Sequence, residues 1–290
     1  MTKGKEKRFR AWTRKAPIIT GFIILGIYFG LNTLSANLKL LAGTGFFGVD
    51  GSWTDFSAQI IDIVWPLILV IAFGYLWIYA RKGFWKVFAL ATPMIIFFIV
   101  QFLSVLAMQY LIPSGGWQTM PMVILGVVIL FGVGFREESL FRGIVATGIG
   151  MKYGKTRGGI WFSVFMSGLI FGLLHVINLL AGMDPSSVIV QVTGAVGIGM
   201  FLTAVYYRGA NIWGLMFLHA LTNLPGLFAV LFTKTEMTGI DALNSMNVFS
   251  LIIVAVQVAL TAFLLRGSKI QEIKDNLESM EKTNTATLSL

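Results

Sequence analysis

Several residue types are scarce in this chain of 290 residues, and each shortage excludes a class of chemistry. The chain has no cysteine, so disulfides, thiolate metal ligands and a cysteine nucleophile are all excluded. It has only two histidines, and charged residues make up 12% of it, about half the fraction that a soluble domain carries. Because 56% of the residues are hydrophobic and the mean hydropathy is +0.81, the composition predicts an all-α, polytopic membrane protein.

The net charge of +9 is distributed as in a membrane protein, so no nucleic-acid partner is expected. Seven of the 22 basic residues lie between Lys3 and Lys15, and most of the others lie in short loops. A basic start followed by an apolar run from Ile18 to Leu34 is similar to a signal peptide. The run is too long for one, however, and further apolar windows follow, so we expect an uncleaved first helix.

Eight apolar windows are long enough to cross about 30 Å of hydrocarbon. With eight spans, the basic loops all fall on the same side of the membrane as the two termini. Because basic loops are usually cytoplasmic, this pattern predicts that both termini are cytoplasmic. We therefore expect a basic cytoplasmic tail at 1–16, a transmembrane helical domain at 17–266 and a cytoplasmic tail at 267–290. The windows are 17–38, 59–80, 84–111, 120–149, 159–181, 187–207, 211–232 and 247–266.

The fourth window contains four charged side chains, at Arg136, Glu137, Glu138 and Arg142. A charge at the bilayer centre costs about 2.5–3.5 kcal/mol, so it persists only where it is paired or where function requires it. Glu138 and Arg142 are four residues apart on one helix face and can form an ion pair. Glu137 is turned by about 100° and remains available to another partner. A salt bridge that only packs helices is the simpler interpretation, but it would need one glutamate rather than two.

Both histidines fall inside predicted spans, each with a companion four residues away: Phe171 before His175, and Asn223 after His219. A lone histidine in a helix is usually a packing residue. Two histidines and a carboxylate pair together are the parts that activate a water molecule, and asparagine can donate to an oxyanion. Counted from the predicted inner helix ends, Glu137, His175 and His219 lie at depths of about 18, 24 and 12 Å. All three are in the membrane, although at different levels.

The chain does not contain the residues that other classes of intramembrane protease use. The chain has no His-Glu-x-x-His zinc helix and no Gly-x-Ser-x-Gly elbow. Asp62 is the only aspartate well inside a window, so an aspartyl dyad has no second member. A small-solute transporter that uses the buried charges is a further alternative, but the chain has no convincing inverted repeat.

Three motifs in this order resemble those of the CPBP family (CAAX proteases and bacteriocin-processing enzymes, also called Abi), which includes the Rce1 enzymes. They are Glu137-Glu138-x-x-x-Arg142, Phe171-x-x-x-His175 and His219-x-x-x-Asn223, within a core at about 120–232. The resemblance implies an eight-helix intramembrane endopeptidase in which Glu137, helped by His175, deprotonates the attacking water. It also implies that His219 and Asn223 stabilise the oxyanion and that Glu138 and Arg142 position Glu137. Phe171 would pack beneath the site or line the substrate path, and Arg136 departs from the usual family pattern.

The resemblance leaves the cofactor open. Glu137, His175 and His219 are candidate ligands of a Zn²⁺ site with one position open for water, and a metal-free glutamate mechanism is equally compatible. The expected partners are the lipid bilayer and a peptide or lipidated protein substrate. Short loops and the lack of an organellar signal favour a bacterial cell membrane, and hence the processing of a peptide pheromone or bacteriocin, or immunity against one. The alternative is a non-catalytic immunity or scaffold protein that binds a peptide or a partner protein.

Overall fold

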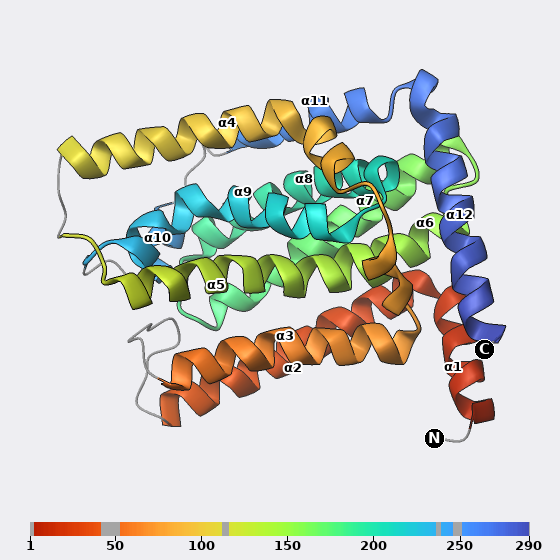
Figure 1. Cartoon of the computed structure of the whole chain (residues 1–290), viewed down its shortest axis with the longest axis horizontal. Coiled ribbons are helices and arrows are strands. Elements are labelled where there is room, and N and C mark those ends of the chain that lie inside the picture. Colours follow the sequence, from red (N-terminus) through yellow and green to blue (C-terminus); the bar gives the residue numbers. More distant parts are fainter. Residues whose placement is uncertain (1–2, 42–52, 112–115, 236–238, 246–250, 290) are drawn as a thin grey trace.

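The computed structural model describes residues 3–41, 53–111, 116–235, 239–245 and 251–289, and these are helical apart from turns and one isolated bridge between Trp117 and Thr233. Most helices run along a common direction, while α1 and α12 cross the same end of the bundle, where both termini lie (Figure 1). Helices α2 and α3 form one side, α4 and α11 form the other, and α5, α7, α8 and α9 lie between them (Figure 1). In chain order the elements are α1 (Lys3–Lys15), α2 (Pro17–Leu41), α3 (Trp53–Phe73), the 3₁₀ segment η1 (Leu76–Ala80), α4 (Phe84–Leu111), α5 (Met120–Glu137), the π-helix η2 (Glu138–Ala146), α6 (Thr147–Tyr153), α7 (Arg157–Leu173), the 3₁₀ segment η3 (Leu174–Leu179), α8 (Pro185–Gly209), α9 (Ile212–Phe232), α10 (Gly239–Asn244), α11 (Leu251–Leu264), the 3₁₀ turn η5 (Gly267–Lys269) and α12 (Ile270–Ser289).

The described residues contain fewer candidate membrane spans than the sequence predicts. Among the described residues, five helical segments are long and apolar enough to cross a membrane. Two bent pairs, α1 with α2 (107°) and α11 with α12 (60°), raise the number to seven if each pair is one span. The predicted count of eight is therefore not confirmed, although the protein is a multi-pass membrane protein. The five segments are 84–111, 120–153, 157–179, 185–209 and 212–232.

The second predicted window, 59–80, differs most from the structure. Helix α3 ends at Phe73, and the chain turns at Gly74, whose φ of +81° is one that glycine adopts readily. Within α3, the apolar stretch Ile63–Phe73 is shorter than a full membrane span. The residues that follow form η1, which lies beside the α5 and η2 region rather than continuing α3.

Glycines bring α7 and α8 into close contact. A Cβ atom built on Gly199 of α8 would lie 2.9 Å from the Cα atom of Gly168 on α7. A Cβ atom on Gly168 would in turn lie 2.9 Å from the carbonyl oxygen of Val196. Small residues at such crossings let the two backbones approach, as is common between membrane helices. This crossing fixes α7, and with it the segment that carries His175, against α8.

The charged segment lies in the protein interior. Every residue from Gly134 to Met151 is buried, including all nine residues of η2. A π-helix is rare and is often found at a functional site. The hydroxyl of Thr147 donates a side-chain hydrogen bond of 2.8 Å to the carbonyl oxygen of Arg142 within this irregular segment. The charges that looked costly in lipid are therefore enclosed by neighbouring helices.

The C-terminal tail predicted at 267–290 forms a docked helix, α12, that lies across the bundle end (Figure 1). Its apolar face is buried at Ile273, Leu277 and Met280. The side-chain amide of Asn276 donates to two of the last carbonyl oxygens of α8, at 3.0 Å each. Because these carbonyl groups have no partner within their own helix, Asn276 both caps α8 and holds α12 in place.

Candidate active site

His219 of α9 lies between the two glutamates. Its Nδ1 is 2.6 Å from Oε1 of Glu138, and its Nε2 is 3.6 Å from Oε2 of Glu137. The approach depends on Gly134, where a Cβ atom would lie 2.5 Å from the carbonyl oxygen of Met216. Helices α5 and α9 therefore touch almost backbone to backbone beside the site. The two glutamates and His219 meet even though their depths counted from the sequence differ, so the inner helix ends are not level.

The predicted ion pair between Glu138 and Arg142 is present, and both side chains are completely buried. Nη1 of Arg142 is 2.8 Å from Oε1 of Glu138, and Nη2 is 3.4 Å from the carbonyl oxygen of Gly199. The guanidinium carbon lies 4.2 Å from the ring centre of Phe171. Because α7 and α8 both contact this arginine, the ion pair connects η2 to the place where α7 and α8 cross.

The contacts of Glu138 determine which ring nitrogen of His219 carries the proton. Opposite the guanidinium of Arg142, Glu138 acts as an anionic acceptor, so Nδ1 of His219 donates to it. In the neutral imidazole, Nε2 is then left with a lone pair, and this nitrogen faces Glu137. At 3.6 Å the two atoms are too far apart for a direct hydrogen bond. Both are acceptors when Glu137 is ionised, so a donor fits between them.

The other carboxylate oxygen of Glu137 is held by α2 and by its own neighbour. The hydroxyl of Tyr28 donates to Oε1 of Glu137 at 3.3 Å. Nη2 of Arg136 lies 3.9 Å from the same oxygen, and its guanidinium carbon is 5.2 Å from the ring centre of Tyr28. Arg136, which departs from the family pattern, thus provides a counter-charge for Glu137. Sequence reasoning missed Tyr28, for which the only signal is a phenol within an apolar window.

The remaining predicted residues lie around this core at different distances. His175 lies in η3, its ring centre is 5.4 Å from that of Phe171, and Phe171 lies 5.9 Å from His219. The imidazole of His175 interacts electrostatically with Glu137 and His219. Its Nδ1 is buried without a hydrogen-bond partner among the described residues, although the backbone of 171 and 172 is close. Asn223, one turn beyond His219, is half-buried and has no hydrogen bond within the described part of the chain.

The candidate metal ligands do not form a complete ligand set. Within the described ranges, no group of three His, Asp or Glu side chains is placed to hold a metal ion. Glu137 and His219 face each other, but His175 does not complete a three-ligand group with them. The residues as placed therefore do not fit the zinc site that was one of the two predicted alternatives, and none of the steps below uses a metal.

Helices long and apolar enough to cross a membrane enclose two glutamates, two arginines and a histidine, and they define a multi-pass membrane protein with a polar interior site. The family model described as type II CAAX prenyl endopeptidase Rce1-like matches residues 117–225, which carry all three motifs. This segment is similar to the Rce1-like proteins, as its motifs indicated, and that family implies a membrane endopeptidase of the CAAX type. Comparison with curated proteins and with solved structures gave no match.

Proposed function

We propose that the protein is an intramembrane endopeptidase in which Glu137 and His219 together activate the attacking water. The observation that carries the proposal is the placement of His219, with Nδ1 against Glu138 and Nε2 facing Glu137. A salt bridge that only packs helices would be complete with Glu138 and Arg142. The second carboxylate instead faces an imidazole lone pair across 3.6 Å, in a region that excludes solvent. A water molecule that donates one hydrogen to each acceptor would be oriented for attack.

The reaction then proceeds in two proton transfers. The water oxygen attacks the carbonyl carbon of the scissile peptide, and its proton passes to Oε2 of Glu137, with Nε2 of His219 as the second acceptor. The proton is next delivered to the leaving nitrogen as the C–N bond breaks, which yields a carboxylic acid and an amine. A positioned general base of this kind contributes about 10²–10⁴ in rate. Glu138 and Arg142 hold His219 in the required tautomer.

His175 and Asn223 are the candidate donors to the oxyanion. The buried Nδ1 of His175 has no partner among the described residues, and a buried polar atom of this kind is one that a ligand can satisfy. The resemblance implied the reverse assignment, with His175 helping Glu137 and His219 beside the oxyanion. We assign the role of assisting Glu137 to His219, because it is hydrogen-bonded to Glu138 and its Nε2 faces Glu137. Loss of one oxyanion donor typically lowers kcat about 10²–10³-fold.

The substrate we propose is a small hydrophobic or membrane-associated peptide, such as a bacterial pheromone or bacteriocin that matures at the cell membrane. The support is the position of the site. Glu137 and His219 are 6% and 4% exposed and lie between helices that cross the membrane, so the scissile bond must come from the lipid or from a segment that enters the bundle. A soluble folded protein would not present a bond at this depth.

The test compares purified wild type with Glu137→Gln, each in lipid nanodiscs, on membrane peptides extracted from cells. We expect cleavage by the wild type and a loss of about 10³-fold in the variant. Glu278→Gln, an exposed substitution of the same kind on α12, should cleave like the wild type. If neither wild type nor variant cleaves while both bind the same peptide, the protein is a non-catalytic binder and the proposal is wrong.

A further inference from the structure

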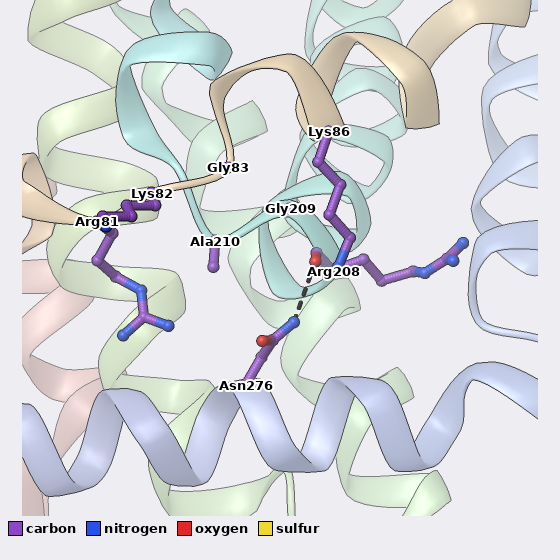
Figure 2. Close-up of a pocket in the computed structure, with 8 residues that line it drawn as sticks. All are labelled: Arg81, Lys82, Gly83, Lys86, Arg208, Gly209, Ala210 and Asn276. Carbon is purple, nitrogen blue, oxygen red and sulfur yellow. Dashed lines mark hydrogen bonds between the residues drawn. The ribbon is translucent and has the colours of Figure 1, made fainter.

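A cationic cleft opens at the bundle end where α12 lies, between the start of α4 and the end of α8 (Figure 2). Its volume is about 400 Å³, within the range of small-ligand sites. Four basic side chains line it: Arg81 and Lys82 from the loop before α4, Lys86 from the first turn of α4, and Arg208 from the end of α8. Neither this cleft nor any of these residues contributes to the proposed catalytic site.

The positive charge of the cleft is only partly neutralised. Glu272 of α12 lies 3.0 Å from Nζ of Lys86 and 3.1 Å from Nη2 of Arg208, and it contacts Lys269 at 3.8 Å. One carboxylate therefore serves two of the four cations that line the cleft, as well as a third outside it. No acidic residue lines the cleft itself. The cleft keeps a net positive charge that an added anion would balance.

Arg81, like Lys82, has no anionic partner among the described residues. Its side chain extends from the loop toward α12 (Figure 2), and the described part of the chain gives its guanidinium no ion pair. Its Nε is buried and has no hydrogen-bond partner there, and the guanidinium carbon lies 5.9 Å from the ring centre of Trp77. A buried arginine nitrogen without a partner is uncommon and points to a missing acceptor. The cleft beside it is where that acceptor would bind.

Backbone groups at the cleft also favour an anion. Gly83, with φ +117°, precedes α4, a helix of 28 residues whose first N–H groups have no partner within the helix. The opposing helix end is that of α8, whose carbonyl groups would repel an anion. Two of them accept hydrogen bonds from Asn276 (Figure 2 shows the one to Arg208), which reduces this repulsion.

We propose that this cleft binds a phosphate group, and that its source is the headgroup of an anionic phospholipid. Arginine and lysine around a helix N-terminus are the groups that recognise phosphate. The lipid source is supported by the face of α4 that continues from the cleft. Trp85, next to Lys86, is 78% exposed, as expected of an aromatic residue at the membrane interface, and Ile96, Ile99 and Leu103 further along are also exposed. A headgroup in the cleft would leave its acyl chains room along this face.

The test measures lipid retention by the purified full chain. Protein in mixed micelles with equal amounts of phosphatidylglycerol and phosphatidylcholine is analysed by native mass spectrometry. We expect the wild type to retain phosphatidylglycerol preferentially, and Arg81→Gln to lower that preference about five-fold, the effect expected for one cation near an anionic surface. Lys82→Gln, an exposed substitution that should not disturb folding, is expected to lower it in the same direction.

Arg157→Gln is the matched control, because Arg157 is an exposed cation at the start of α7, outside the cleft. It should leave the lipid preference unchanged. The site is refuted if Arg157→Gln lowers the preference as much as Arg81→Gln, or if the wild type neither prefers phosphatidylglycerol nor responds to inorganic phosphate. A second arm adds inorganic phosphate at constant ionic strength. If phosphate raises the thermal midpoint of the wild type but not of Arg81→Gln, while phosphatidylglycerol is not retained, the phosphate site stands and the lipid source is refuted.

Discussion

Replacement of Arg142 by methionine tests how strongly the buried charges hold the site together. The substitution keeps a long side chain but removes the cation, so Glu138 remains completely buried with His219 as its only polar partner among the described residues. The other oxygen of Glu138, Oε2, already has no hydrogen-bond partner among the described residues. Removal of one member of a buried ion pair costs about 3–5 kcal/mol because the other charge is left uncompensated. We expect Arg142→Met to lower the free energy of unfolding by that amount.

A double-mutant cycle separates the ion pair from the packing. In Glu138→Gln the negative charge is absent, so Arg142→Met should cost less there, with a coupling energy of up to about 3 kcal/mol. The assay is unfolding in mixed micelles by titration with dodecyl sulfate, followed by far-ultraviolet circular dichroism. Arg157→Met, at an exposed position, should change stability by less than about 0.5 kcal/mol. A cost of Arg142→Met that is equal in both backgrounds would refute the reasoning, because the arginine would then act through packing alone.

Three further predictions concern other parts of the molecule. Tyr28→Phe removes the donor to Oε1 of Glu137 at 3.3 Å, and a hydrogen bond to a charged group contributes about 1.5–3 kcal/mol. We expect kcat to fall about ten-fold with an unchanged thermal midpoint. An unchanged kcat would show that Tyr28 does not position the carboxylate. Gly199→Ala places a Cβ atom 2.9 Å from the Cα atom of Gly168 and should destabilise the protein by about 1–3 kcal/mol. Gly194→Ala on the same helix meets nothing within 4 Å and should be neutral or stabilising by up to about 1 kcal/mol. Equal thermal midpoints for the two variants would contradict the close crossing of α7 and α8. Burial alone would raise the pKa of Glu272, but hydrogen bonds from Lys86 and Arg208 outweigh it and hold the pKa below its ordinary value of 4.5. Because the folded-state pKa is lowered, the stabilisation is complete above pH 4.5 and is lost as the pH falls through the folded-state value. The thermal midpoint of the wild type should therefore be higher than that of Glu272→Gln at pH 7, and this difference should disappear in acid. A difference that does not change with pH would show that the Glu272 carboxylate does not stabilise the protein in this way.

The sequence predicted the parts of the site that lie on one helix. Glu138 and Arg142 are four residues apart, and that spacing determined their pairing before any tertiary contact was known. The class of protein was equally accessible, because apolar windows and the placement of basic loops depend on composition alone. The motif region also coincides with the segment that matches the Rce1-like family.

The relations between helices were not predictable in the same way. The contact of His219 with both glutamates depends on how closely α5 approaches α9, which is set by Gly134 against the backbone at Met216. Tyr28 reaches Glu137 across more than a hundred residues of chain. Composition gives no signal for a π-helix, since the change in hydrogen-bond register depends on the surrounding packing. The second window extends past the end of α3 because hydropathy does not register the turn at Gly74.

The most direct test of the central claim follows the oxygen atom of the attacking water. Wild type and Glu137→Gln, each in nanodiscs, are incubated with a membrane peptide substrate in ¹⁸O-labelled water, and the products are analysed by mass spectrometry. The account predicts that the wild type places one ¹⁸O atom in the new C-terminal carboxylate and that Glu137→Gln forms this product about 10³-fold more slowly. Label incorporation by Glu137→Gln at the wild-type rate would contradict the assignment of Glu137 as the base.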